Sequence, residues 1–320
     1  MLNRRQLRIK ALQSIYAHFQ SDSDDLVSTE KVLLKNINQL YNLYIYQLSF
    51  ISEVISFAEE SLEVSKNKYI PTPDDLNPNT RFINNAFIKA LDKNKDFKRK
   101  EKALKINWKD TKDIVRKVVH DFRSSKEYVK YMQSETVSFK EDKEILIKLI
   151  RNHLIFNDVL RSYFEEIESM WSEDYYMALA LVIKTLHDTK ASWNEDAPLP
   201  DLFKTDAQTG KNEDKKFLIE LVHNTILNKD RFDEIIVEKL HNWEFDRIAV
   251  MDLILLRMGM SEIFEMPSIP LKVTLNESIE LAKHFSSPRS SIFINGLLDR
   301  TISEGLKSKT VVKTGRGLIG

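Results

Sequence analysis

The scarcity of helix-breaking residues constrains this chain more than any other feature. Seven glycines and eight prolines occur among its 320 residues. Inside a helix, glycine costs about 1 kcal/mol and proline about 3 kcal/mol relative to alanine, so a chain poor in both is suited to long helices. No run of alternating β-branched residues competes with this pattern. The sequence therefore predicts an all-α fold.

Apolar periodicity locates the helices. In the segment 3–20, Leu7, Ala11, Ile15 and Phe19 recur at every fourth position and form one apolar stripe. The stretch 29–67 is longer, rich in aromatic residues and too apolar on one side to stand alone in water. Further helices are predicted at 83–91, 110–132, 142–168, 173–188, 215–228, 231–242, 246–265 and 272–285, with a last one after them.

Two long breaks suggest how the chain is divided. Residues 69–82 hold three prolines and form a loop, and residues 191–214 form the second break. We place the domain junction in this second break, between an N-terminal helical region at 1–190 and a C-terminal helical subdomain at 214–304. The small and basic tail at 305–320 is predicted to be disordered.

Composition excludes several classes of protein. Cysteine is absent, which rules out disulfides, thiolate nucleophiles and cysteine-based metal sites. No apolar run reaches the ~18 residues of a membrane span, and no apolar segment of a signal peptide follows the basic N-terminus, so we expect a cytoplasmic protein without membrane contact. The 48 basic and 48 acidic residues balance. Any nucleic-acid binding must therefore come from a local patch.

The sequence offers little for catalysis. No GxGxxG, P-loop, GxSxG or HExxH motif occurs, so we expect neither an enzyme nor a bound cofactor. Two Glu-x-x-His pairs, Glu220/His223 and Glu238/His241, have the spacing of di-iron bundles. The first pair falls opposite the apolar face of its helix, which favours solvated pairs over a metal site.

The first residues are more promising. Arg4, Arg5 and Arg8 are helical neighbours, Lys10 adds charge, and no acidic residue occurs before Asp22. Arginine side chains bind phosphates through two hydrogen bonds and stack on bases, as RNA binding requires. The alternative is a solvated, frayed N-terminus. A second basic cluster, at 93–109, has the spacing of a solvated helix face.

The segment "SSPRSSIFINGLLDR" at 286–300 contains a further candidate. Phe293 lies among apolar residues, which favours a core position, but it also lies near the first turn of a helix, where its ring could stack on a base. Gly296 stands in the middle of this predicted helix, where a glycine is unfavourable.

Taken together, these segments resemble the NusB family. Residues 242–300 carry the family's Arg247, Asp252, Arg257 and Glu262, followed by "IPLKV", "NESIELAK" and "FINGLLD". The N-terminal "RRQLRIKALQSIYAHFQ" resembles the arginine-rich first helix of the family. The resemblance covers residues 1–20 and 214–304, and leaves 30–190 as a large helical insertion or extension.

The resemblance implies an all-helical protein of two small subdomains without catalytic activity. It further implies a transcription antitermination factor that binds boxA-type single-stranded RNA together with the ribosomal protein NusE. This complex would join the RNA polymerase elongation complex on ribosomal RNA operons. A homodimer is a further option that the sequence leaves open.

The resemblance also assigns roles to residues. Arg4, Arg5 and Arg8 match the arginine-rich motif, and Tyr16 matches a tyrosine close to the RNA. Phe293 matches a phenylalanine that stacks on a base, which overrides the local preference for the core. Gly296 is expected to admit close packing of helices. The family's acidic and lysine residues before this phenylalanine are replaced by "RSSI", so Arg289, with Ser290, becomes the candidate for phosphate contact.

Two other functions are open to such a chain. The altered segment 289–292 and the large helical addition fit a helical protein–protein adaptor that has lost RNA binding. A NusB-like domain also precedes certain ribosomal RNA cytosine methyltransferases, but these need a cysteine nucleophile, which this chain lacks.

Overall fold

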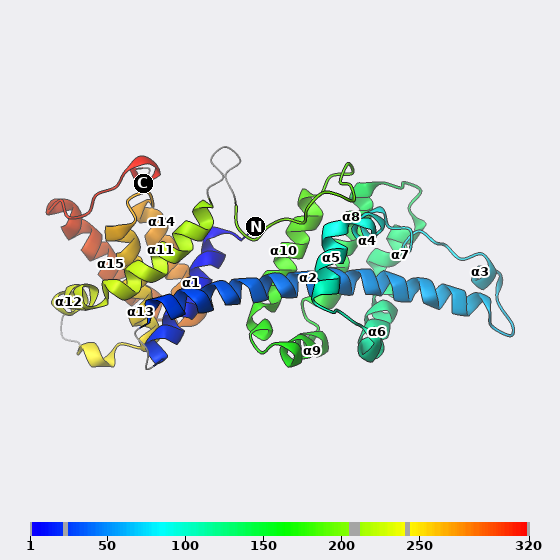
Figure 1. The fold of residues 1–320 in the computed structure, drawn as a ribbon, viewed down its shortest axis with the longest axis horizontal. Helices are drawn as coiled ribbons and strands as arrows, with labels where there is room; N and C mark the ends of the chain where they lie inside the picture. Colours follow the sequence, from blue (N-terminus) through cyan, green and yellow to red (C-terminus); the bar gives the residue numbers. More distant parts are fainter. Residues whose placement is uncertain (1, 22–24, 205–211, 241–243, 319–320) are drawn as a thin grey trace. The chain divides into compact units, whose positions relative to one another are not determined.

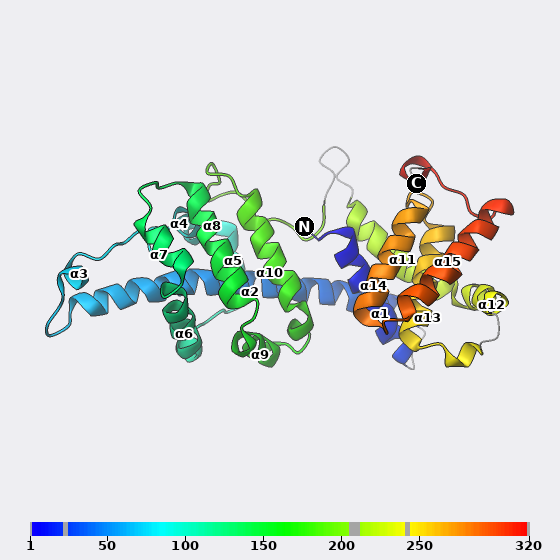
Figure 2. The same cartoon turned by 180° about the vertical axis from the view of Figure 1, so that it is seen from behind.

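A computed structural model describes residues 2–21, 25–204, 212–240 and 244–318. All regular secondary structure in these ranges is helical (Figures 1 and 2), which confirms the predicted all-α fold. The chain forms two compact units. The inserted unit is residues 38–202, and the terminal unit combines residues 2–37 with the residues from 203 onward.

Helix α2 (Leu26–Lys66) contributes to both units, its first residues to the terminal unit and the rest to the inserted unit. The other helices of the inserted unit are α3 (Pro73–Leu76), α4 (Ala86–Lys93), α5 (Lys95–Ala103), α6 (Lys112–Arg123), α7 (Lys126–Gln133), α8 (Phe139–Leu149), α9 (Asp158–Ile167) and α10 (Trp171–Asp188). The terminal unit holds α1 (Arg4–Gln20), the start of α2 (Leu26–Lys66), α11 (Glu213–Leu227), α12 (Lys229–Lys239), α13 (Val250–Glu265), α14 (Leu271–Phe285) and α15 (Ser290–Lys307). Short 3₁₀ turns lie at 109–111, 245–247 and 315–318, and a π-helical turn at 150–154.

Helix α13 is the centre of the terminal unit. It packs against α1, α11, α12, α14 and α15, and its residues 254–263 are all buried. A helix that is surrounded in this way must be apolar on nearly every side, as the sequence "LILLRMGMSEI" is. Helix α1 packs against α11 and α13, and Asn3 and Gln6 form a capping box at its start. The structure thus groups the first helix with the C-terminal helices, whereas the sequence suggested one N-terminal region at 1–190.

Close packing between α13 and α15 depends on Gly259. A Cβ atom at this position would lie 2.7 Å from Cδ1 of Leu298. Gly296 behaves differently, because a Cβ atom there would meet nothing within 4 Å. The expectation that Gly296 allows close helix packing is therefore wrong. Its helix turns that position toward open space.

The inserted unit is built on α2. In Figure 2, α7, α8 and α10 lie in front of this helix. Its buried side chains recur every three or four residues and include Leu40, Tyr44, Leu48, Ile51, Ile55 and Ala58. The hydroxyl of Tyr44 lies 2.9 Å from that of Thr185 on α10, so the buried polar group of the Tyr44 side chain has a hydrogen-bond partner. Tyr46 adds ring contacts with Trp108 and Trp171.

Two helices that the sequence predicts as continuous are divided. The predicted helix 110–132 ends at Arg123, and Ser125 begins α7 by accepting a hydrogen bond from the backbone N–H of Tyr128. The predicted helix 142–168 is interrupted before Asn157, whose side chain caps α9. Serine and asparagine compete for backbone hydrogen bonds, and here this preference outweighs the apolar periodicity.

The prediction of a disordered tail does not fit its described residues, 305–318, which are packed. The Nζ atom of Lys313 donates to the carbonyls of Glu262 and Met266 at 2.7 and 3.1 Å, and Val311 is buried. Burial lowers the pKa of Lys313 to about 8. The tail therefore satisfies carbonyl groups at the end of α13 that have no partner within the helix.

Candidate nucleic-acid interface

The three arginines of α1 lie in different environments. The guanidinium of Arg8 is buried, and its Nε and Nη2 atoms lie 2.6 and 3.0 Å from the carboxylate oxygens of Glu262. Both side chains are 4% exposed. The hydroxyl of Thr274 donates to the same carboxylate at 2.8 Å. Arg8 thus fastens α1 to α13, and it would have to break a buried ion pair to reach a phosphate.

Arg4 and Arg5 remain at the surface, with 44% and 42% of their side chains exposed. Arg5 donates two hydrogen bonds to Glu277, at 2.9 and 3.0 Å, and these raise its pKa. Arg4 lies 3.2 Å from Asp214 and over the ring of Phe217, and partial burial lowers its pKa. Both guanidiniums are therefore accessible but partly neutralised by carboxylates.

Tyr16 is also accessible, with 41% of its surface exposed. It follows Arg5 by eleven residues, which at 3.6 residues per turn places the two within about 20° of each other around α1 and about 16 Å apart along it. One face of α1 therefore presents a cationic group at one end and an aromatic ring at the other.

A polar network holds the segment that leads into α15. The buried carboxylate of Asp252, on α13, accepts hydrogen bonds from the hydroxyls of Ser286 and Ser290, the latter at 2.7 Å. Ser287 joins the network through Ser290, at 2.7 Å. Ser290 is therefore buried and positions the helix, whereas Arg289 is exposed and faces solvent.

Phe293 lies in the first turn of α15 and is half-buried. It borders an open depression of about 270 Å³ between α12 and α15. The depression is lined by Lys239, Leu240, Ile292, Phe293, Gly296, Leu297 and Arg300. The ring of Phe293 is thus neither enclosed in the core nor fully exposed, and it borders an open depression. The two cations beside it were not identified from the sequence.

Helix α13 links the two groups of candidate residues. Glu262 holds Arg8 of α1, and Asp252 holds Ser290 of α15. These two positions are ten residues apart, or about 15 Å along the helix. The sequence marks both acids as family residues, but it does not reveal which side chains they bind.

The substitution Gly296→Ala tests the role of this glycine. We expect the free energy of unfolding to rise by about 0.5–1 kcal/mol, because alanine favours the helix and its Cβ has space. We also expect weaker binding of any ring that stacks on Phe293, since the methyl group narrows the depression. Urea denaturation and RNA titration measure the two effects. Gly259→Ala is the matched control and should lower the free energy of unfolding, because its Cβ would meet Leu298. A lower free energy of unfolding in Gly296→Ala would contradict the open space around Gly296.

The Glu-x-x-His pairs do not converge in the described residues. The Nε2 atom of His223 lies 3.0 Å from Glu30, and Glu220 lies 3.6 Å from Lys216. His241 is outside the described residues. Among the residues that are described, no group of three or more potential ligands is arranged to hold a metal ion. No helix in that part of the chain is long and apolar enough to cross a membrane.

Comparison with known proteins identifies the family. A model of the NusB family matches residues 176–303. The transcription antitermination protein NusB of Geobacter sulfurreducens is 35% identical over 123 residues, which cover 38% of this chain and 89% of that protein. The chain belongs to the NusB family. The resemblance seen in the sequence is thereby confirmed, and the inserted unit explains why this NusB family member is longer than its relatives.

Other NusB proteins match over a smaller share of their length. Those of Chloroherpeton thalassium and Salinibacter ruber are each 41% identical over 106 residues, which cover 33% of this chain and 50% and 66% of the two proteins. The chain thus spans about half to two thirds of the length of these relatives. A solved structure of NusB from T. maritima is 28% identical, covers 33% of this chain and 74% of that chain, and has a TM-score of 0.29.

Proposed function

We propose that this protein is a transcription antitermination factor that binds boxA-type single-stranded RNA together with the ribosomal protein NusE. In this proposal it acts in the cytoplasm, within the RNA polymerase elongation complex, and catalyses no reaction. The observation that carries the proposal is a half-buried Phe293 beside an open, cation-lined depression, in a chain of the NusB family. Single-stranded RNA is commonly recognised by stacking its unpaired bases on such rings.

The proposal gives the candidate residues separate tasks. Arg4, Arg5 and Arg289 contact phosphates, whereas Tyr16 and Phe293 stack on bases. Arg8 and Ser290 act from inside the protein, by holding α1 and α15 on α13. Because Asp214 and Glu277 already share the surface arginines, RNA must compete with these carboxylates.

The salt dependence of binding tests this division. Each phosphate contact on a single strand contributes about 0.7 to the slope of log affinity against log salt. The variant Arg4→Gln/Arg5→Gln should therefore lower the slope for a boxA-type RNA by about 1.4. Lys229→Gln/Arg231→Gln removes the same charge from α12 and should leave the slope unchanged. An unaltered slope in the first variant would exclude both arginines from the RNA interface.

The second candidate is an adaptor that binds protein without RNA. It is favoured by the ion pairs that occupy all three arginines of α1. Titration with a boxA-type RNA and a scrambled RNA of the same composition distinguishes the two functions. Binding of neither RNA, with binding of NusE intact, would establish the adaptor. Equal affinity for both RNAs would refute selective recognition of boxA, and with it our proposal.

A further inference from the structure

The inserted unit contains a strongly basic segment. Residues 93–134 hold fourteen lysines and arginines against six acidic residues, in a chain whose formal charge is zero. The excess is therefore balanced elsewhere in the chain and acts locally. A local excess of this kind attracts polyanions even when the whole protein is neutral.

The basic segment forms an open depression of about 650 Å³ at the end of α5. Its lining residues are Lys98, Glu101, Lys102, Lys105, Ile106, Asn107 and Lys109. Glu101, the one acid among them, lies 3.1 Å from Nζ of Lys98 and accepts a hydrogen bond of 2.7 Å from Ser49. The lining charge is therefore dominated by its lysines.

Three of these lysines have no acidic partner. Lys102, Lys105 and Lys109 are exposed, and none lies within ion-pair distance of a carboxylate in the described part of the chain. Five other exposed cations of the segment do have such partners, for example Arg99 with Asp96 at 2.7 Å, whereas Lys93, Lys117, Lys126 and Lys130 lie within ion-pair distance of no carboxylate among the described residues. An anion would meet three lysines that are not already neutralised.

The backbone holds one of these lysines in an unusual conformation. Lys105 has φ of 52°, in the left-handed region, where glycine is usual. It is the second residue after the last residue of α5 and directly follows the C-cap residue Leu104. The backbone N–H of Lys105 donates to the backbone carbonyl of Lys102, and the backbone N–H of Ile106 donates to that of Glu101. This is the hydrogen-bond pattern of a Schellman motif. A lysine is thus present where glycine would be less strained, and it lines the depression.

The loop beneath the lysines is fixed in place. Trp108 is buried, and its indole N–H donates to Ser49 at 2.9 Å. The side-chain oxygen of Asn107 accepts from the backbone N–H of Lys109 at 3.0 Å. The charges are therefore carried on an ordered support, which lowers the entropy lost when an anion binds.

We propose that Lys102, Lys105 and Lys109 bind the phosphodiester backbone of RNA that extends beyond the element recognised by the terminal unit. This inference rests on the RNA-binding function proposed above. An acidic protein is a poorer fit, because protein interfaces centre on buried apolar or aromatic anchors, and Ile106 is the one large apolar side chain lining the depression. Backbone binding needs charge alone and carries no sequence preference.

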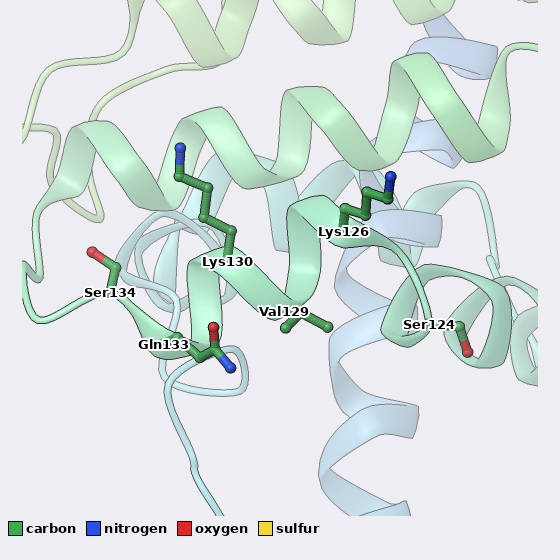
Figure 3. A pocket seen from close by; sticks show the side chains of 6 residues that line it. All are labelled: Ser124, Lys126, Val129, Lys130, Gln133 and Ser134. Atoms are coloured by element: carbon green, nitrogen blue, oxygen red, sulfur yellow. The ribbon is translucent and has the colours of Figure 1, made fainter.

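A second basic depression serves as a comparison. It has a volume of about 550 Å³ and is lined by Ser124, Lys126, Val129, Lys130, Gln133 and Ser134. In Figure 3, Lys126 and Lys130 extend from α7 on the same side, one turn apart. This site holds two cations, lacks a lysine in a strained conformation, and exposes Val129. We therefore assign the RNA to the depression at α5.

Two RNAs test the assignment. One is a 12-nucleotide boxA-type RNA, and the other is a 40-nucleotide RNA in which the same element is followed by uridines. In the variant Lys102→Gln/Lys105→Asn/Lys109→Gln, asparagine suits the left-handed position. We expect affinity for the long RNA to fall about tenfold and its salt slope to fall by about 2, since three contacts are removed. Affinity for the short RNA should stay unchanged.

A charge-matched control removes three lysines that do face carboxylates. Lys66→Gln/Lys68→Gln/Lys140→Gln eliminates partners of Glu63, Asp75 and Glu144 in the same unit. Unchanged affinity in this control supports the proposal. An equal loss in both triple variants, no loss in the first, or a loss confined to Lys126→Gln/Lys130→Gln would each overturn it.

A 30-nucleotide oligouridine separates this inference from the proposed function. If the wild type binds oligouridine and the first triple variant does not, the basic surface stands even when boxA selectivity is absent. If the protein selects boxA but binds the long RNA no more tightly than the short one, binding of RNA by the three lysines is refuted, while the proposed function stands.

Glycine substitutions at the two left-handed lysines test whether the charge of Lys105 is used. Lys309 has φ of 60° after α15, so it matches Lys105 in conformation. We expect Lys105→Gly and Lys309→Gly each to raise the thermal midpoint by about 2–4 °C. Only Lys105→Gly should weaken binding of the long RNA, by about twofold to threefold. The same variant should lower the slope of log affinity against log salt by about 0.7, since one phosphate contact is lost. Equal binding by both variants would show that the charge of Lys105 is not used.

Discussion

The substitution Arg8→Ala should lower the free energy of unfolding by about 3–5 kcal/mol, the largest effect we expect from any single change in this protein. The carboxylate of Glu262 is buried beside Arg8 and would lose its cation. The hydroxyl of Thr274 would remain as a hydrogen-bond donor, which is insufficient for a buried charge. Urea denaturation measures the loss.

Two variants check the cause. Arg5→Ala removes an arginine of the same helix whose ion pair is partly exposed, and it should change stability by no more than about 1 kcal/mol. Arg8→Met/Glu262→Met removes both charges and should recover most of the lost stability. If Arg8→Ala is as stable as the wild type, Arg8 does not fasten α1 to α13.

The substitution Asp252→Ala should lower the free energy of unfolding by about 2–3 kcal/mol, because buried Ser290 loses its charged acceptor. Ser286 loses the same acceptor. The segment that leads into α15 would then be less well fixed. We therefore also expect weaker RNA binding, because Phe293 lies one turn further along, and the two effects are measured by urea denaturation and RNA titration.

A serine variant separates the contributions. Ser290→Ala removes the hydrogen bonds of Ser290 with Asp252, Ser286 and Ser287. Asp252 keeps the hydrogen bond from Ser286, so the loss of stability should be smaller than in Asp252→Ala. If Asp252→Ala weakens RNA binding while Ser290→Ala does not alter it, positioning of α15 through Ser290 is refuted. Equal stability of Asp252→Ala and the wild type would contradict the network itself.

Much of the fold was predictable because helical signals are local. The apolar stripe of α1 and the prolines after α13 define their helices from neighbouring residues alone. The divisions at Ser125 and Asn157 were missed, because capping by a single polar side chain was outweighed by a continuous apolar period in the sequence. The packed tail was missed because Lys313 binds carbonyls of α13 that lie far away in sequence.

The candidate residues could be named from the sequence, but their environments could not be predicted from it. The sequence shows three arginines with similar spacing, yet only their distant partners separate Arg8 from Arg4 and Arg5. Gly296 looked like a packing residue, and Gly259 performs that task instead. The direction of each side chain depends on how α1, α13 and α15 pack, and no local pattern reports it.

Photo-crosslinking shows which residues lie against the bases of a bound RNA. A boxA-type RNA carrying 4-thiouridine at single positions would be irradiated with the full-length protein, and the crosslinked peptides identified by mass spectrometry. We expect crosslinks to peptides that contain Tyr16 or Phe293, and their loss when a scrambled RNA replaces the element. Crosslinks confined to residues 38–202, or equal crosslinking of both RNAs, would contradict it.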